Sequence, residues 1–171
     1  IFKAETTGPI SDKVAPKLKD TAKILYIAYL GITVLQTALL MLGGMDLFQA
    51  LIHTFGTVGT GGFSTKNTSV GAFHSSYITL VIGIFMMLSG INFSLYYELY
   101  KKRFRHILQN IELRAYLSII LVSTILIAIN IYSLYGSVFE SFKHAFFQVS
   151  SIITTTGYSS VNYDLWPSFS K

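Results

Sequence analysis

Residues 45–64 read MDLFQALIHTFGTVGTGGFS, and residues 140–159 read ESFKHAFFQVSSIITTTGYS. Both stretches join an apolar segment, too short to cross a bilayer, to a loop rich in Gly, Ser and Thr. An offset of 95 residues aligns the two loops, so that Gly62 coincides with Gly157, Phe63 with Tyr158 and Ser64 with Ser159. The chain therefore contains one short unit twice, which indicates an architecture built from repeats.

Long uncharged apolar runs surround these two stretches. Residues 24–43, 78–97 and 117–134 contain no charged side chain, and about 20 helical residues cross the roughly 30 Å hydrocarbon core of a bilayer. The composition agrees, because 51% of the 171 residues are hydrophobic and only 12% are charged. Three such runs in so short a chain indicate membrane spans rather than the buried helices of a large soluble protein.

The order of these segments predicts an all-α integral membrane protein built from repeated units of transmembrane helix, re-entrant pore loop and transmembrane helix. Irregular backbone is tolerated at membrane depth only where protein buries it or where it lines a water-filled cavity. The chain opens with Ile1 and lacks the pattern of a signal peptide, so we expect an internal piece of a longer protein. We divide it into a linker at 1–23, a complete unit at 24–99 with its loop at 60–64, a basic loop at 100–114, and a second unit at 115–171 that stops after its loop at 155–159.

The basic residues are placed unevenly along the chain, which carries a formal net charge of +5. Ten of the 13 lysines and arginines lie within 1–23 and 100–114, and the other three are Lys66, Lys143 and Lys171. Cytoplasmic loops of membrane proteins carry an excess of basic residues, so we expect both basic segments in the cytoplasm and both pore loops on the outside. Charge clustered beside apolar runs argues against nucleic-acid binding and for contact with membrane lipid.

The loops have the composition that a potassium site needs. A potassium ion exchanges its water shell for backbone carbonyls when several carbonyls point the same way, and glycine permits the unusual backbone angles that this requires. The carboxyl end of the preceding short helix would stabilise a cation at the membrane centre. The expected potassium filter consists of Thr60, Gly61, Gly62 and Phe63 in one loop and of Thr155, Thr156, Gly157 and Tyr158 in the other. The alternative interpretation is that the two loops are ordinary glycine-containing turns that bind no ion.

Several segments together resemble the TrkH/TrkG/KtrB family of potassium transporters, which is related to the plant HKT proteins, and most closely its TrkH-type branch. The resemblance covers essentially the whole chain. It is carried by the segments FKAETTGP, APKLKDTAK, HTFGTVGTGGFSTKNTSVGAF, LSGINFSL and AFFQVSSIITTTGYSSVNYDLWP.

The resemblance implies four helix, pore-loop and helix units around one pore like that of potassium channels, with Gly62 and Gly157 as two of the four filter glycines. It implies potassium as the transported ion and the bacterial cytoplasmic (inner) membrane as the location. It also implies a homodimer and a cytoplasmic TrkA-type nucleotide-binding regulatory subunit. The chain matches the second unit and most of the third, so we expect that it does not conduct by itself.

Two other functions are open at this point. The transporter could carry both potassium and sodium, or the chain could belong to a structural membrane protein without transport. We expect no enzymatic activity, because the three apolar runs contain no Asp, Glu, His, Lys or Arg that could act as acid, base or metal ligand. The chain also has no cysteine, which excludes disulfides and thiolate chemistry.

A few other residues have two interpretations. We interpret His53 and His144 as packing or hydrogen-bonding residues of the short helices, because a metal site needs three or four convergent ligands. Asp46, Glu140 and Asp164 could attract cations or simply begin helices. Asn92 could line the pore or bond to another helix. We expect close helix contacts at Gly31, Gly83 and Gly90, and an interfacial aromatic anchor at Tyr163 and Trp166.

Overall fold

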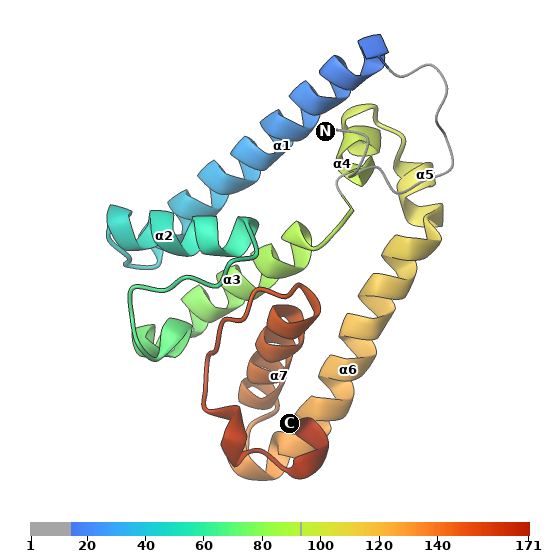
Figure 1. The fold of residues 1–171 in the computed structure, drawn as a ribbon. Coiled ribbons are helices and arrows are strands. Elements are labelled where there is room, and N and C mark those ends of the chain that lie inside the picture. Colours follow the sequence, from blue (N-terminus) through green and yellow to red (C-terminus); the bar gives the residue numbers. More distant parts are fainter. Residues whose placement is uncertain (1–14, 93) are drawn as a thin grey trace.

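The computed structural model describes residues 15–92 and 94–171, with side chains from Ala22 onward, and every regular element within them is helical (Figure 1). The α-helices are α1 (Ala15–Leu42), α2 (Leu47–Val58), α3 (Ser76–Ser89), α4 (Ser94–Tyr100), α5 (Phe104–Gln109), α6 (Ile111–Tyr135) and α7 (Val138–Ile153). Short 3-10 turns lie at η1 (Ser69–Phe73), η2 (Tyr163–Leu165) and η3 (Ser168–Ser170).

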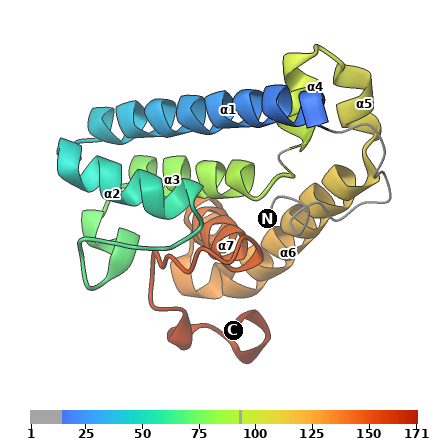
Figure 2. The same cartoon turned by 45° about the horizontal axis from the view of Figure 1, so that its top comes forward.

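Helices α1, α2 and α3 form the first unit. Helices α1 and α3 run side by side, and the short α2 lies against both of them (Figure 2). Asp46 begins α2 by accepting a hydrogen bond from the amide of Gln49 at 2.9 Å, so the structure gives this aspartate the role of a helix cap. Leu40 of α1 and Ile82 of α3 are fully buried in the core between these helices.

Helices α6 and α7 repeat the arrangement of α1 and α2. Ser137 caps α7 as Asp46 caps α2, and α7 packs against both α6 and α3, so that the two units share one core (Figure 1). The expected aromatic anchor stays a prediction for Tyr163, whereas the burial of Trp166 favours a packing role for that residue. Tyr163 is half exposed, but Trp166 is buried and donates from its Nε1 to the hydroxyl of Tyr135 at 3.2 Å.

The apolar run at 78–97 does not form one straight helix. It divides into α3 and α4, whose axes are bent by 94°. Helix α3 ends where Gly90 passes close to α6, and Asn92 begins α4 by accepting a hydrogen bond from the amide of Ser94. The Asn92 amide group donates to the carboxylate of Glu112 at 3.1 Å, which favours the second of its two interpretations, a bond to another helix.

The break leaves the carbonyls at the end of α3 with partners. Tyr116 of α6 donates its hydroxyl to the Met87 carbonyl at 2.9 Å, and Tyr96 of α4 donates to the Leu88 carbonyl at 2.7 Å. Unpaired carbonyls at a helix end cost several kcal/mol in hydrocarbon, so these two hydroxyls stabilise an interruption that an apolar sequence alone does not reveal.

The start of α1 and the basic residues after α4 lie at the same end of the described structure (Figure 1). Helix α4 sits beside α1, α5 contacts α4 and α6, and the short loop between α4 and α5 carries Lys101, Lys102 and Arg103 (Figure 1). The region 100–114 is therefore not an open loop, because it contains α5 and the start of α6. The expected linker at 1–14 lies outside the described residues.

The structure predicts that Gly90→Ala weakens packing between α3, α6 and α7. A Cβ at Gly90 would lie 2.4 Å from the Tyr116 hydroxyl and 2.7 Å from a methyl carbon of Thr154, and such overpacking costs about 1–3 kcal/mol. The backbone of Gly90 has ordinary right-handed angles that alanine adopts without strain. The apparent melting temperature of the protein in detergent should therefore fall by several degrees.

Gly31→Ala is the matched control, since a Cβ there meets nothing within 4 Å. The expectation of a close helix contact at Gly31 is thus wrong for the part of the chain that the structure describes, whereas a Cβ at Gly83 would lie 3.0 Å from the ring of Phe146. Alanine at position 31 should leave the melting temperature unchanged or raise it. Equal melting temperatures for the two variants would contradict the packing argument.

Candidate functional site: two adjacent pore loops

The two pore loops leave their short helices along the same backbone path. After α2, the φ angle is positive at Thr60 (50°) and Gly62 (65°). After α7, it is positive at Thr155 (58°) and Gly157 (84°), the positions paired with the first two by the 95-residue offset. In both loops the residue between has an ordinary negative φ, so left-handed and ordinary conformations alternate over three residues.

The same hydrogen bonds fold each loop back onto its helix. A carbonyl in the last turn of the helix accepts bonds from the amides of two loop residues, five and six positions further along. The donors are Gly61 (2.8 Å) and Gly62 (3.0 Å) to the carbonyl of Gly56, and Thr156 (2.9 Å) and Gly157 (3.3 Å) to that of Ser151. The sequence repeat is thus a repeat of backbone geometry as well.

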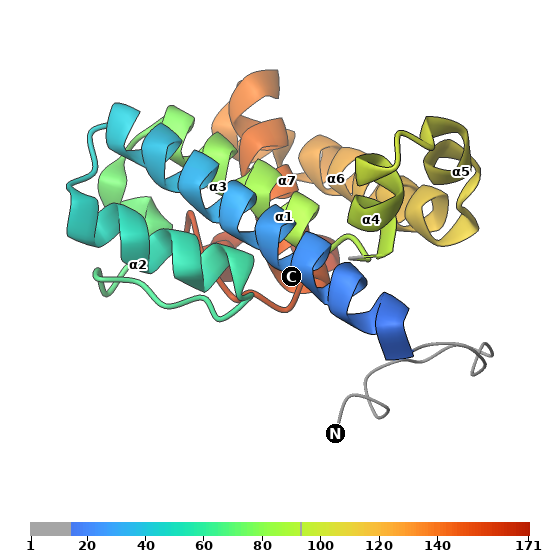
Figure 3. The same cartoon turned by 90° about the horizontal axis from the view of Figure 1, so that it is seen from above.

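The loops lie on the same side of the molecule and touch one another (Figure 3). A Cβ added at Gly62 would lie 2.0 Å from the carbonyl oxygen of Thr156, which leaves room at this position for glycine alone. Gly157 has the matching backbone angle, but a Cβ there would meet nothing within 4 Å. The first loop therefore has the second loop as its neighbour, whereas the corresponding side of the second loop is open.

Tyr158 joins the second loop to the first. Its side chain is 2% exposed and stacks on His53 of α2 with ring centroids 5.9 Å apart. Its hydroxyl donates to the carbonyl oxygen of Phe63 at 2.8 Å and lies 3.2 Å from that of His53. Phe63, which occupies the equivalent position in the first loop, is 73% exposed. Tyr158 thus contacts the first unit, whereas Phe63 is largely exposed in the part of the chain that the structure describes.

Two of the eight expected filter residues use their carbonyls to hold the loops in place. The Phe63 carbonyl accepts from Tyr158, and the Tyr158 carbonyl accepts from the hydroxyl of Ser151 at 2.7 Å. Both carbonyls are directed at hydroxyl groups of the protein. Of the remaining six residues, the structure brings Gly62 against Thr156 and Gly157 at the contact between the loops. Thr60, Gly61 and Thr155 share the repeated backbone path.

Both histidines of the short helices hold a serine that follows a filter segment. His53 Nε2 lies 3.0 Å from the Ser64 hydroxyl, and His144 Nδ1 lies 3.1 Å from the Ser160 hydroxyl. His53 also bonds through Nδ1 to the carbonyl of Gln49 in its own helix. These bonds support the interpretation of both residues as hydrogen-bonding groups. Among the described residues, no three His, Asp or Glu side chains converge as a metal site would require.

Two polar contacts between the loops could not be recognised in the sequence. The Gly71 amide donates to the carbonyl of Ser159 at 3.2 Å, and the Ser159 amide donates to the hydroxyl of Ser69 at 3.2 Å. Neither Ser69 nor Gly71 belongs to the repeated motif. The two contacts can be recognised only in the structure, where the segment that follows the first loop lies beside the second loop.

The N-terminal end of α7 holds an ion pair between a buried lysine and a partly exposed glutamate. Lys143 is 5% exposed, and its ammonium group donates to the Glu140 carboxylate and to the Ser76 hydroxyl at the start of α3. The hydrogen bond from Lys143 is the main cause of the lowered pKa of Glu140. Glu140 is therefore paired with a buried cation and contributes little to attracting ions from solution, which favours a structural role for it.

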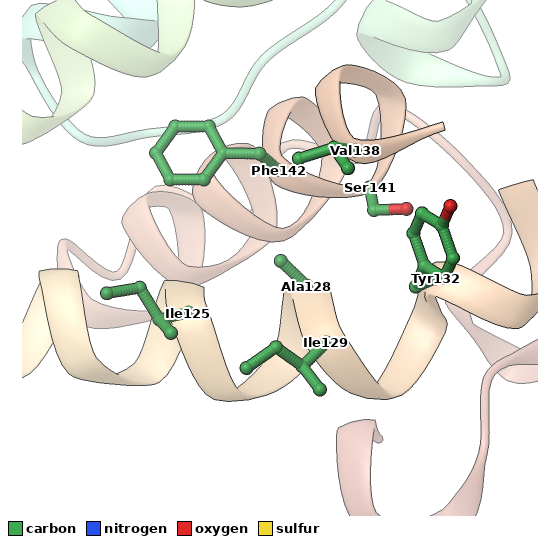
Figure 4. Close-up of a pocket in the computed structure, with 7 residues that line it drawn as sticks. All are labelled: Ile125, Ala128, Ile129, Tyr132, Val138, Ser141 and Phe142. Atoms are coloured by element: carbon green, nitrogen blue, oxygen red, sulfur yellow. The ribbon is translucent and has the colours of Figure 1, made fainter. Parts of the chain in front are cut away.

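A groove away from the pore loops has mainly apolar walls. The groove between α6 and α7 in Figure 4 has a volume of about 390 Å³ and is lined by Ile125, Ala128, Ile129, Tyr132, Val138, Ser141 and Phe142. Its walls are apolar apart from two hydroxyl groups, and several of these side chains are exposed. This surface suits a membrane environment and offers no acid or base for catalysis.

The comparisons with known proteins agree on one family. The TrkH family, described as a cation transport protein, matches residues 3–171. The Escherichia coli (strain K12) Trk system potassium uptake protein TrkH is 35% identical over 173 residues, which is 99% of this chain and 36% of that protein. The corresponding TrkG protein is 37% identical over 174 residues, 98% of this chain and 35% of that protein.

A solved structure agrees with the sequence relatives. The crystal structure of the potassium transporter TrkH from Vibrio parahaemolyticus matches with a TM-score of 0.84 and 30% identity, over 93% of this chain and 35% of that one. The chain thus spans about a third of the length of these relatives, which are transporters rather than enzymes. On its sequence and on its fold, the chain belongs to the TrkH family of cation transport proteins.

Proposed function

We propose that the chain is the central part of a potassium uptake protein and that its two pore loops form half of a potassium filter. The observation that carries this proposal is the shared geometry of two adjacent loops, each with alternating left-handed and ordinary backbone angles. Successive carbonyls of an extended strand point to opposite sides. Alternation of this kind turns them to one side, as the coordination of a dehydrated potassium ion requires.

The backbone carbonyls of six residues are the candidate potassium ligands. They belong to Thr60, Gly61 and Gly62 in the first loop and to Thr155, Thr156 and Gly157 in the second. The carbonyls of Phe63 and Tyr158, by contrast, bind hydroxyl groups and keep the two strands in register. The carboxyl ends of α2 and α7 point towards the filter segments that follow them, where their partial negative charge favours a cation.

The unmatched surfaces of the two loops support a ring of more than two units. Phe63 is exposed where Tyr158 is buried, and Gly157 has open space where Gly62 has a neighbouring strand. Repeating the observed contact would place a preceding unit against Phe63 and a following unit against Gly157. The family resemblance implies four units in such a ring, and the relatives, about three times as long as this chain, are long enough to contain them.

The location and the partners follow from the same proposal. The protein lies in the bacterial inner membrane, with 1–23 and 100–114 in the cytoplasm and the pore loops facing outside, as the placement of basic residues indicates. It forms a homodimer and binds a cytoplasmic TrkA-type subunit. The relatives are named as members of a Trk system, which supports a multi-component transporter.

Substituting the filter glycines should lower potassium selectivity. Gly62→Ala would place a Cβ 2.0 Å from the Thr156 carbonyl, and Gly157→Ala would put alanine at a φ of +84°, which costs about 1–2 kcal/mol. In the full-length protein, either change should reduce discrimination of potassium over sodium by about tenfold. The measurement is growth and ion uptake at limiting potassium in cells that lack their own potassium transporters.

Gly136→Ala is the control for backbone strain. Gly136 has a φ of +62°, and a Cβ there meets nothing within 4 Å, but it ends α6 away from the loops. Gly136→Ala should therefore leave the selectivity for potassium over sodium unchanged. Uptake that is indifferent to both loop glycines would refute the filter assignment. An intact protein that transports both ions equally would favour the mixed cation transporter, and no uptake despite normal expression and a supplied TrkA-type subunit would favour a structural protein.

Tyr158→Phe should weaken the filter without disturbing its packing. The substitution keeps the ring on His53 but removes the hydroxyl that binds the Phe63 carbonyl. A hydrogen bond of this kind contributes about 1 kcal/mol, so we expect potassium affinity or selectivity to fall by about fivefold. Tyr163→Phe removes a hydroxyl from a half-exposed tyrosine as the control. Equal potassium uptake kinetics in the two variants would count against a role for the Tyr158 hydroxyl.

A further inference from the structure

A groove between α1 and α4 has the features of a phospholipid site. Its volume is about 570 Å³. Ile24, Ile27 and Ala28 of α1 form one wall, and Leu99 and Tyr100 of α4 form part of the other. Lys23 lies at the end of the groove nearest the start of α1, and it is the last charged residue before the apolar span begins. Tyr96 of α4 completes the lining, so the groove is largely apolar, with two tyrosines in its α4 wall, and cationic at one end.

This combination fits an amphiphile with an anionic head. An ammonium group at the edge of an apolar span lies at the depth of the lipid headgroups. The apolar walls continue outward as exposed surface, since Ile27 is 57% exposed and Leu99 is 46% exposed. An acyl chain can cover such a surface along the helices while the phosphate meets Lys23.

The charge around the groove favours an anionic lipid over a zwitterionic one. Lys101, Lys102 and Arg103 follow directly after α4, and all three are exposed. The one acidic residue of α4, Glu98, forms an ion pair with Arg103 at 3.7 Å. The rim of the groove therefore keeps an excess of positive charge, which attracts the anionic lipids of the cytoplasmic leaflet.

The repeat indicates that this face of α1 is free of the preceding unit. In the second unit, Tyr116 and Ile120 of α6 face the closing helix of the first. The 95-residue offset maps Ile120 onto Leu25 of α1. Around a helix, Leu25 is about 160° from Lys23 and Ile27 but about 60° from Ala28. A preceding unit on the Leu25 side would therefore leave the Lys23 and Ile27 wall of the groove free.

We propose that this groove binds an anionic phospholipid of the cytoplasmic leaflet, with Lys23 at the phosphate and the acyl chain between α1 and α4. The proposal rests on the membrane orientation of the proposed function, but not on the filter. The lipid would hold the inner half of the bent closing helix against α1, where no other described helix fills the groove.

The test measures phosphatidylglycerol retained by the purified full-length protein from vesicles of phosphatidylglycerol and phosphatidylcholine, by native mass spectrometry. Lys23→Gln removes the charge, and Ile27→Trp fills the groove. One basic residue near an anionic headgroup changes binding by about fivefold, so Lys23→Gln should lower retention by about that factor. Ile27→Trp should lower it at least as much. Two controls should retain the wild-type amount of lipid. Lys66→Gln changes an exposed lysine outside the groove, and Val34→Trp lies on the same face of α1 as Ile27, two turns further on.

Retention by both groove variants equal to that of the controls would overturn the site and would indicate that another protein segment fills the groove. Displacement by soluble glycerol phosphate would also overturn it, because it would show a site for the free anion. If Ile27→Trp does not fold, Lys23→Gln decides the outcome alone. Potassium uptake measured in parallel separates this test from the proposed function, since a transporting wild type that retains no phosphatidylglycerol contradicts only the lipid site.

Discussion

Irregular backbone at membrane depth needs hydrogen-bond partners from the protein wherever it does not line water, and the amide hydrogen bonds of the pore loops supply such partners. The carbonyls of Gly56 and Ser151 each accept two loop amides, so each short helix supplies partners for the chain that leaves it. These bonds also set the direction in which each loop returns. The position of Gly62 against Thr156, and of Tyr158 against α2, follows from that return path.

Much of the fold could be predicted from the sequence because its strongest signals are local. Uncharged apolar runs predicted α1 and α6, and the 95-residue offset paired loops that share both backbone angles and hydrogen bonds. The break between α3 and α4 could not be predicted in this way. It depends on Tyr116 and Glu112, which lie about 20 to 30 residues further along and act only once α6 is packed beside α3.

The site shows the same division between local and long-range information. The glycines and threonines of the loops were recognisable, because their composition suits a left-handed backbone. The roles of Phe63 and Tyr158 were not, because the repeat makes them equivalent and the structure makes them different. Phe63 is exposed and Tyr158 is buried, because Tyr158 packs against the first unit of the chain. No feature within the motif itself carries that information.

The hydroxyl of Tyr158 has a consequence for the order in which the protein matures during synthesis. It reaches a carbonyl of the first loop that precedes it by 95 residues, and ribosomes add about 5–20 residues per second. The first loop therefore waits about 5–20 s after its own synthesis before its final partner exists. A newly inserted unit would remain conformationally immature until its successor arrives, and quality-control proteases would meet it in that interval.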